Sequence, residues 1–298
     1  MGYKVSVIIT TYNREYSIVR RAIKSVLNQT YSDYELIVVN DTPSEFPTFD
    51  EVTNGITEFK GKLKYIANGI NHGACFVRNQ GFKESMGEYI AFLDDDDEWL
   101  HNKLQEQVQL ILSKNCVMVT CGFNCIWLDS NNKQIKQKIK NNRRYEITLQ
   151  EVLFKNIVGG CSAPLISRKA FIKCGGFNID MPAAQDADLW IRLAKIGNIY
   201  CVLKPLLNYY IYKAERISNN PAKKIYAIKY LIEQYKDLVD KQALFLKDKY
   251  IIIAYYYYVL ENKEDGYRYY KLAKRQNVIS KTSVFYYFKI IKLKIKNI

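Results

Sequence analysis

The sequence predicts an α/β fold whose first part is built on a parallel sheet, followed by a C-terminal α-helical region. Two observations predict it. Short apolar runs alternate with segments of helical spacing over the first hundred residues, which is typical of βαβ units. After Asn219-Asn220-Pro221 the pattern changes to long helical periodicity rich in Tyr, Ile and Leu. We therefore predict two domains, residues 1–218 and residues 219–298.

Short apolar runs mark the expected strands, because strands of a parallel sheet are buried on both faces. These runs are Val5–Thr10, Glu35–Asn40, Leu63–Ala67 and Glu88–Leu93. Helical spacing separates them at 18–27 and 73–84. Later in the chain we expect strands over 117–128 and near 135, a helix over 186–196 and an extended segment over 199–212. The tail, 288–296, alternates basic and apolar side chains, which fits a strand, a frayed helix or a membrane-surface patch.

The composition excludes several classes of protein. Of the 298 residues, 48% are hydrophobic and 25% are charged, which excludes a wholly disordered chain. No run approaches the roughly 18 uncharged apolar residues that a membrane span needs. The N-terminus does not resemble a signal peptide either. We expect a cytoplasmic protein in which the seven cysteines are buried free thiols.

The net charge of +14 is unevenly distributed. Residues 219–298 hold 17 basic and 7 acidic side chains, a net charge of +10, whereas residues 1–218 carry a net +4. A basic surface attracts nucleic acid, anionic lipid or phosphorylated substrates. The alternative is that the charge reflects a Lys-rich composition throughout the chain, and both interpretations stay open.

Three polar clusters follow predicted strands, at the edge where open α/β sheets bind their ligands. They are Thr10–Asn13, Asn40-Asp41 and Asp94–Asp97. Four adjacent carboxylates repel one another unless a cation is near, and hard oxygen ligands suit Mg²⁺ or Mn²⁺. The alternative is a solvated acidic loop that caps a helix at Glu98. Because the chain has only two His, acid–base chemistry is expected to use carboxylates.

Several of these segments resemble, in order and spacing, the motifs of family 2 glycosyltransferases of the bacterial surface-polysaccharide type. The matching segments are 5–14, 25–30, 39–41, 73–81, 87–97 and 185–192, so the resemblance covers about residues 3–218. It implies the GT-A fold, a Rossmann-like mixed sheet flanked by helices. It also implies an inverting transferase that moves a sugar from a UDP-sugar to a glycan or lipid-linked acceptor in bacterial surface-polysaccharide synthesis.

The resemblance also implies roles for individual residues. The expected nucleotide-binding residues are Thr10, Tyr12, Asn13, Arg14, Asp41, Arg78 and Asp95. Asp41 would accept the ring N–H of uracil, which cytosine lacks. Asp94 and Asp96 match the DxD motif, which would hold Mn²⁺ or Mg²⁺ on the diphosphate, and Asp186 matches the general base. Many relatives carry a metal-binding His near 209–213, and this chain has none there. Lys213 and Arg216 are expected to contact the phosphates instead.

Some residues near these motifs have plainer interpretations. Tyr12 and Trp190 are candidates for core packing, and Asp188 is expected to pair with Arg192, four residues along the same helix. Gln185 and Asn40 replace acidic residues that relatives often carry.

Two other functions remain as alternatives. One is a nucleotidyltransferase that uses the same pocket, and the other is a basic, non-catalytic RNA- or anion-binding module. On the favoured interpretation the chain binds no specific nucleic acid, and its basic C-terminal part contacts an anionic membrane surface.

Overall fold

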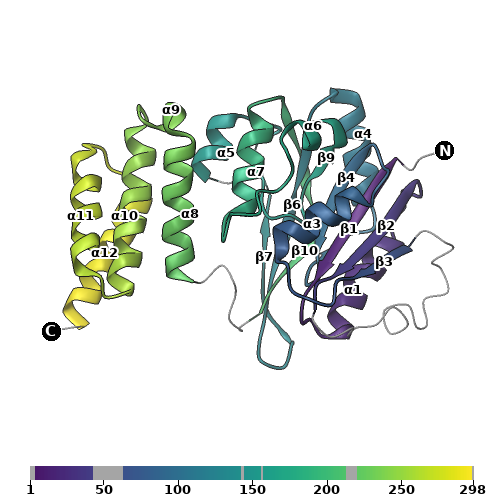
Figure 1. Ribbon diagram of the computed structural model, residues 1–298, viewed down its shortest axis with the longest axis horizontal. Helices are drawn as coiled ribbons and strands as arrows, with labels where there is room; N and C mark the ends of the chain where they lie inside the picture. The colour runs from purple at the N-terminus through teal and green to yellow at the C-terminus, as the bar shows by residue number, and fades with distance from the viewer. Residues whose placement is uncertain (1–3, 43–62, 142–143, 156, 213–219, 297–298) are drawn as a thin grey trace. The chain divides into compact units, whose positions relative to one another are not determined.

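The computed structural model describes residues 4–42, 63–141, 144–155, 157–212 and 220–296 (Figure 1). The chain divides into two compact units. Unit 1 comprises Met1–Ile179 and Asp186–Lys213, and unit 2 comprises Asp180–Gln185 and Ala214–Ile298. The short segment 180–185, just before the predicted general base, therefore groups with the C-terminal helices, which the sequence did not indicate. The expected boundary at residue 218 lies outside the described residues and stays a prediction.

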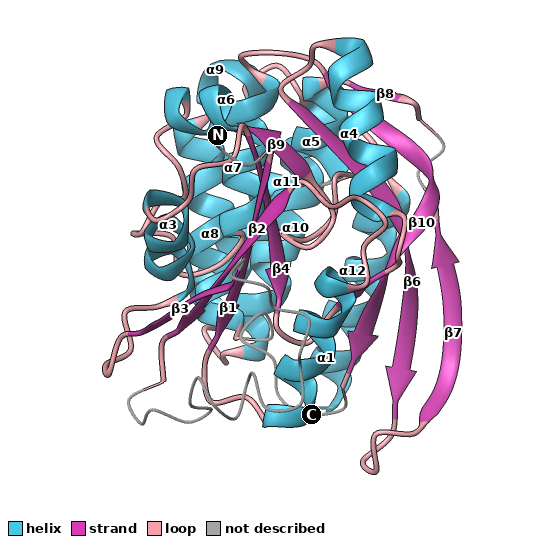
Figure 2. Ribbon diagram, turned by 90° about the vertical axis from the view of Figure 1, so that its right-hand side faces the viewer, coloured by secondary structure: helices cyan, strands magenta, loops and turns pink. Residues whose placement is uncertain are grey.

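Unit 1 is built on a mixed sheet, in which ten strands are described (Figure 2). Their order is β3-β2-β1-β4-β9-β6-β10-β5, with β7 paired to β6 and β8 to β10. The strands are β1 (Val5–Thr11), β2 (Tyr34–Asn40), β3 (Leu63–Ala67), β4 (Tyr89–Asp94), β5 (Glu98–Trp99), β6 (Met118–Leu128), β7 (Gln134–Lys140), β8 (Glu146–Ile147), β9 (Leu165–Ser167) and β10 (Ile199–Ile211). Strands β3, β2, β1 and β4 are parallel, whereas β9 is antiparallel to β4 and β6. The mixed sheet that the resemblance implied is confirmed.

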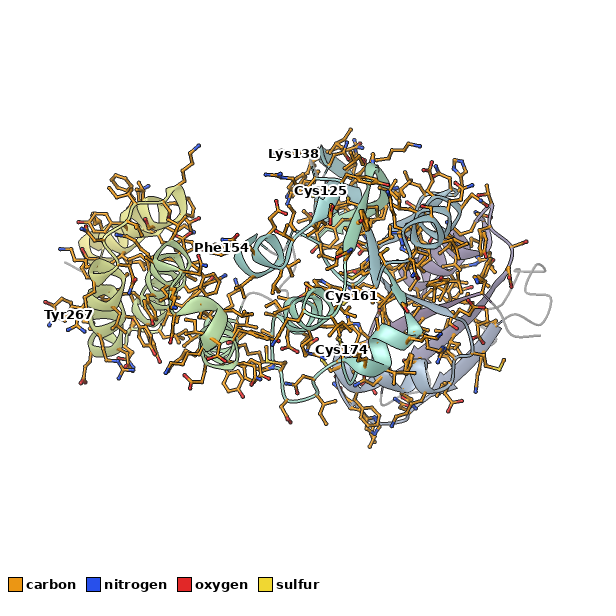
Figure 3. All side chains as sticks on the ribbon, turned by 90° about the horizontal axis from the view of Figure 1, so that it is seen from above. Cys125, Lys138, Phe154, Cys161, Cys174 and Tyr267 are labelled. Atoms are coloured by element: carbon orange, nitrogen blue, oxygen red, sulfur yellow. The ribbon has the colours of Figure 1, made fainter. Side chains whose placement is uncertain are left out.

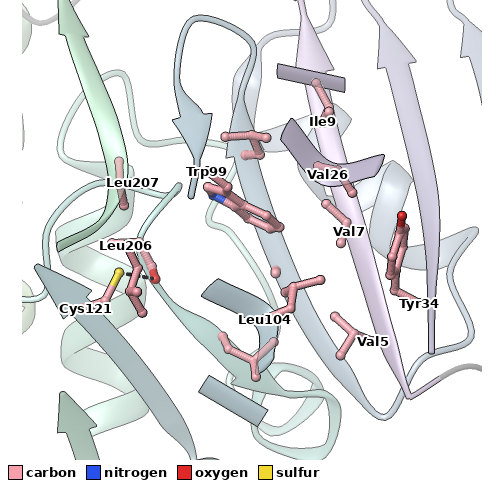
Figure 4. Packing of buried hydrophobic residues seen from close by; sticks show 14 of the residues in the cluster. Val5, Val7, Ile9, Val26, Tyr34, Trp99, Leu104, Cys121, Leu206 and Leu207 are labelled. Atoms are coloured by element: carbon pink, nitrogen blue, oxygen red, sulfur yellow. Dashed lines mark hydrogen bonds between the residues drawn. The ribbon is translucent and has the colours of Figure 1, made fainter. Parts of the chain in front are cut away.

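Helices cover both faces of this sheet. They are α1 (Tyr16–Leu27), α3 (Ala74–Lys83), α4 (Lys103–Lys114), α5 (Leu149–Lys155), α6 (Arg168–Lys173) and α7 (Gln185–Ala194). The odd residues of β1, from Val5 to Ile9, share a core with side chains of α1 and α4 (Figure 4). On the opposite face, α3 comes so close that a Cβ on Gly81 would lie 2.5 Å from Cγ2 of Ile8. Because alternate strand residues point to opposite faces, both faces of β1 are buried, and its one polar residue before Thr10, Ser6, donates a hydrogen bond to Oε1 of Glu35 at 2.6 Å.

We call Asp94–Asp97 the acidic run. It does not cap a helix at Glu98, so this alternative is wrong. Glu98 and Trp99 form β5, which pairs antiparallel with Leu207 and Asn208 of β10, and α4 begins only at Lys103. Burial explains the difference, because the Trp99 side chain is only 3% exposed and its indole Nε1 donates to the Ser162 carbonyl at 2.9 Å.

The described C-terminal part of unit 2, from residue 220 onward, is helical, as predicted. It contains α8 (Pro221–Gln234), α9 (Lys236–Val239), α10 (Ala243–Val259), α11 (Lys263–Arg275) and α12 (Lys281–Lys296). Asn220 caps α8, because its side chain accepts a hydrogen bond from the Lys223 N–H at 3.1 Å. The tail of the chain is thus a helix rather than a strand. No described helix combines the length and the apolar character that crossing a bilayer would require.

All seven cysteines are free thiols, as expected. Six of them are buried and Cys174 is partly exposed. Figure 3 shows Cys161 and Cys174 on unit 1.

Candidate active site

The strand register brings the predicted motifs to one edge of the sheet. In the parallel pairs of β1, Thr10 lies opposite Asp94 of β4, and Thr11 lies opposite Asn40 of β2. The residues that follow these strands, from Tyr12, Asp41 and Asp95 onward, therefore leave the sheet at the same carboxyl edge. Ligands of open α/β sheets bind at this edge, so the structure groups the candidates where the chemistry was expected.

Asp41 is buried at the start of α3. Its Oδ2 accepts hydrogen bonds from the backbone N–H groups of His72 at 2.9 Å and Gly73 at 2.8 Å. Its Oδ1 accepts from Nδ2 of Asn68 at 3.0 Å and lies 3.2 Å from Nδ1 of His72. The carboxylate thus makes four polar contacts already, with three residues. Two of them satisfy backbone N–H groups that precede the first turn of the helix and have no partner within it. A uracil N–H would have to replace one of the four contacts, and the two side-chain partners are the easiest to displace.

Asn40, which replaces an acidic residue of many relatives, is fully buried. Its Nδ2 donates to the Tyr65 hydroxyl at 3.0 Å and its Oδ1 accepts from the Thr42 N–H at 3.0 Å. The amide supplies a donor and an acceptor without adding a buried charge, which explains why this replacement is tolerated beside Asp41.

Two arginines contact three of the four carboxylates of the acidic run. Arg14 donates from Nε to Oδ1 of Asp95 at 3.0 Å and from a terminal nitrogen to Oδ2 of Asp96 at 3.2 Å. Arg78, on α3, donates to Oδ1 of Asp94 at 2.8 Å. The repulsion within the run is therefore offset by guanidinium groups of the chain itself, and these are residues that the resemblance placed at the nucleotide.

The last carboxylate of the run, Asp97, is buried and held by a serine. The Ser162 hydroxyl donates to Oδ2 of Asp97 at 2.6 Å and accepts from the Asp94 N–H at 3.0 Å. Burial raises the pKa of Asp97 well above its usual range, and the charges of Asp96 and Asp94 add to the effect. Burial likewise raises the pKa of Asp95 to about 6, although the Arg14 charge opposes the shift.

A further arginine, Arg21 of α1, contacts the backbone of the acidic run. It donates to the backbone carbonyl of Asp96 at 2.8 Å and to the Tyr212 hydroxyl at 2.9 Å. Its guanidinium lies 3.9 Å from the centre of the Tyr210 ring. Tyr210 in turn donates to Oε2 of Glu98 at 2.8 Å, so Arg21 connects the acidic run with the end of β10. None of these contacts was predicted from the sequence.

Asp186 occupies the first turn of α7 and is partly exposed. Its Oδ1 accepts from the Ala187 N–H at 2.8 Å. The charges of Arg78, Asp94 and Asp186 all act on the buried thiol of Cys161, whose pKa is raised by burial first of all. Since these charges reach one thiol, Asp186 lies at the same end of unit 1 as the acidic run.

Of the structural interpretations given to Asp188, Trp190 and Tyr12, two are confirmed and one is wrong. Asp188 pairs with Arg192 at 2.6 Å and Trp190 is fully buried, as expected. Tyr12, in contrast, is 44% exposed, so its interpretation as a core residue is wrong. The neighbouring Asn13 has a φ of 46°, and its N–H donates to Oγ1 of Thr42 at 2.9 Å, which fixes the turn that leaves Tyr12 exposed.

The residues present fit a divalent metal ion whose coordination shell is completed by oxygen atoms of the substrate. Among the described residues, no group of three or more His, Cys, Asp or Glu is placed to hold a metal ion. Asp94 and Asp96 nevertheless offer carboxylate oxygens, and Mg²⁺ is commonly held by one or two carboxylates together with substrate phosphates. Lys213 and Arg216, expected at the phosphates, lie outside the described residues.

A cavity of about 560 Å³ lies beside α1 and β5. Its lining includes Arg20, Arg21 and Lys24, but none of the described residues that were predicted to bind nucleotide, metal or acceptor. The described residues predicted to bind the donor therefore lie outside this cavity.

Comparison with known proteins agrees with the resemblance. The model of the family described as glycosyl transferase family 2 matches residues 6–175. The Escherichia coli UDP-Glc:alpha-D-GlcNAc-diphosphoundecaprenol beta-1,3-glucosyltransferase WfgD is 32% identical over 201 residues, which cover 67% of this chain and 73% of WfgD. An uncharacterised glycosyltransferase of Haemophilus influenzae is 27% identical over 256 residues, which cover 84% of this chain and 83% of that protein.

A solved structure has the same fold. The crystal structure of Staphylococcus aureus TarS 1–349 in complex with UDP-GlcNAc superposes with a TM-score of 0.60 at 16% identity and covers 92% of both chains. Another TarS crystal structure contains a longer chain, of which this protein covers 43%. The likeness confirms the GT-A fold.

Proposed function

The chain belongs to glycosyl transferase family 2, and we propose that it moves a sugar from a UDP-sugar to a lipid-linked or glycan acceptor, with inversion at the anomeric carbon. The proposal places this reaction in bacterial surface-polysaccharide synthesis. One observation carries the proposal. Asp41 and the acidic run lie at the same edge of the sheet, together with Arg14 and Arg78. The names of WfgD and the TarS complex support a UDP-sugar donor, and that of WfgD supports a diphospholipid acceptor.

Donor binding is assigned to the edge of the sheet. Thr10 lies near the end of β1, and Tyr12 and Asn13 follow that strand beside Asp41. The exposed Tyr12 ring offers a flat apolar surface to a base. Arg14 and Arg78 now hold carboxylates, and both lie where they can exchange these partners for diphosphate oxygens. Asp95, which Arg14 also contacts, is assigned to the ribose.

Asp94 and Asp96 are assigned to Mn²⁺ or Mg²⁺. Such an ion stabilises the negative charge that develops on the departing UDP. The chain contributes by holding these carboxylates in place, because Arg78 contacts Asp94, and Arg21 contacts the carbonyl of Asp96.

Asp186 is assigned the proton transfer. Its carboxylate would take the proton from the acceptor hydroxyl as that oxygen attacks the anomeric carbon. Partial exposure suits this role, since the acceptor must reach the group. Neighbouring Asp188 is unsuited, because it is buried and paired with Arg192.

The donor assignment is tested by thermal unfolding of wild type and Asp96→Ala with UDP, GDP, CDP or ADP, each with and without Mn²⁺. We expect UDP with Mn²⁺ to raise the Tm of the wild type by about 5–10 °C at roughly 100 times Kd, because a ligand that binds only the folded state stabilises it. The Asp96→Ala protein should show no such shift. If no nucleotide stabilises the wild type, the donor assignment is wrong.

The base assignment is tested separately with Asp186→Asn. This variant should keep the shift in Tm with UDP and Mn²⁺ but lose turnover by about 10²–10⁴-fold, because the amide cannot accept the proton. Asp180→Asn, which changes a nearby carboxylate without an assigned role, serves as the control. Unchanged transfer by Asp186→Asn would rule out this residue as the base.

A further inference from the structure

Helix α12 carries apolar side chains on both of its faces. Ile290 is buried in the core of unit 2, whereas Val284, Phe285 and Phe288 are 43%, 55% and 58% exposed. A helix on a protein surface normally presents polar side chains to water. Figure 1 shows α12, in yellow, beside α10 and α11, and the packing of the buried face does not explain the outward one.

The exposed apolar surface continues beyond the helix. Ile279, just before α12, is 82% exposed. A hollow of about 440 Å³ is lined by Ile279, Ser280, Lys281, Val284 and Phe285. Single exposed apolar residues are ordinary, but a continuous exposed patch marks an interaction site.

Basic side chains border this patch. Lys281 and Lys292 are exposed and lie on the same helical stripe as Phe285 and Phe288, at spacings of three or four residues. Residues 266–298 contain no acidic residue and nine basic ones, namely Arg268, Lys271, Lys274, Arg275, Lys281, Lys289, Lys292, Lys294 and Lys296. We call Ile279, Lys281, Val284, Phe285, Phe288 and Lys292 the α12 face.

We propose that the α12 face binds the surface of an anionic membrane. Phe285 and Phe288 would enter the boundary between headgroups and acyl chains, while Lys281 and Lys292 contact lipid phosphates. The aliphatic Ile279 and Val284 favour lipid over nucleic acid, since bases stack on flat aromatic side chains. A second copy of the chain is disfavoured, because it would bring two strongly basic surfaces together.

The inference deepens the proposed function and in part rests on it, because a diphospholipid acceptor is met at a membrane. The binding itself depends only on unit 2. It is therefore measured without donor or acceptor, so that its failure would leave the assignment of the transfer reaction untouched.

The test is co-sedimentation of the full chain with vesicles of phosphatidylglycerol mixed with phosphatidylcholine, and with vesicles of phosphatidylcholine alone. We expect binding to the mixed vesicles only. Phe285→Ser/Phe288→Ser and Lys281→Gln/Lys292→Gln should each weaken it at least about tenfold. Tyr226→Ser/Leu244→Ser, which changes exposed apolar residues of α8 and α10, is the matched control and should bind like the wild type.

A reporter variant locates the contact. Tryptophan at the helix, introduced as Phe288→Trp, should be quenched by brominated lipid in the mixed vesicles more strongly than the wild-type tryptophans. The proposal would be overturned if both double variants bound the mixed vesicles as strongly as the wild type. It would also be overturned if the Phe288→Trp protein bound without stronger tryptophan quenching than the wild type. No binding of the wild type, together with a self-association that Phe285→Ser/Phe288→Ser abolishes, would assign the α12 face to a second copy instead.

Discussion

Lys103 is an ionisable residue placed in the hydrophobic interior of unit 1. Its side chain is fully buried, its Nζ donates to Oε1 of Gln107 at 2.6 Å, and it lies 4.1 Å from the centre of the Trp99 ring. Burial lowers its pKa from 10.5 to about 8. Between pH 8 and 10.5 the unfolded chain keeps a proton that the folded protein has released, so this group makes stability rise with pH there.

We therefore expect Lys103→Met to be more stable than the wild type at pH 7, by roughly 3 kcal/mol at most. The lost hydrogen bond to Gln107 reduces the gain. At pH 10 the advantage should be smaller, because the lysine is then mostly neutral in the folded protein. Urea unfolding of both proteins at the two pH values measures this. A difference in stability that does not change with pH would contradict it.

Arg21 offers a second test at the level of one side chain. Arg21→Gln removes the charged donor that connects the Asp96 carbonyl with Tyr212. A hydrogen bond of this kind contributes about 1.5–3 kcal/mol, so the affinity for UDP with Mn²⁺ should fall roughly tenfold or more. Arg20→Gln, one position earlier on α1, is the control. Equal losses in both variants, measured by titration calorimetry, would show that Arg21 has no special role.

The sequence predicted the residues that lie within motifs but not those that support them. Asp41, Asp94 and Asp96 follow predicted strands, so local pattern was enough to place them at one edge. Arg21 and Tyr212 are separated by 191 positions, and Ser162 and Asp97 by 65. Contacts over such distances depend on the completed fold, and the polar residues that make them look like ordinary surface residues in the sequence.

At the scale of elements, the close approach of α3 to β1 positions the site. Helix α3 begins at the Asp41 carboxylate and carries Arg78 to Asp94, and it can lie this close because residue 81 has no side chain. The sequence predicted both elements but not their separation, because a glycine inside a helix has several explanations.

Gly81→Ala should therefore destabilise the protein. Alanine favours helices by up to about 1 kcal/mol over glycine, but a methyl group 2.5 Å from the buried Ile8 forces a shift that typically costs about 1–3 kcal/mol. Gly160→Ala, where a Cβ would meet nothing within 4 Å, is the control. Urea unfolding should show a net loss for Gly81→Ala alone. A stabilised Gly81→Ala would mean that α3 moves away from β1 without difficulty.

On the scale of the whole molecule, a short segment of unit 2 directly precedes the helix that carries the proposed base. Residues 180–185 group with the C-terminal helices, and Asp186 follows directly. The predicted two-domain division, drawn from the change to helical periodicity after residue 218, assigns residues 180–185 to the first domain. A change in hydrophobic periodicity along the chain predicts where a helical region begins, but it does not predict which earlier segment packs with that region.

A chain ending at residue 218 should therefore keep UDP binding and lose most of its turnover. The described residues that we assign to the donor and the metal belong to unit 1, so this truncated protein should still be stabilised by UDP with Mn²⁺. Segment 180–185 would lack the helices it groups with, and turnover should fall at least about tenfold because Asp186 is less well positioned. Full turnover by the truncated protein, in a coupled assay of UDP release, would contradict this expectation.

The lack of a disulfide among the seven cysteines has a practical consequence for studying the protein. Buried thiols react slowly with alkylating reagents, and burial raises the pKa of Cys75, Cys116 and Cys121 to about 11. Only Cys174 is partly exposed. With Cys174→Ser as background, a cysteine introduced on either unit offers a maleimide dye one fast-reacting position, so fluorescence can follow each unit separately in the otherwise native chain.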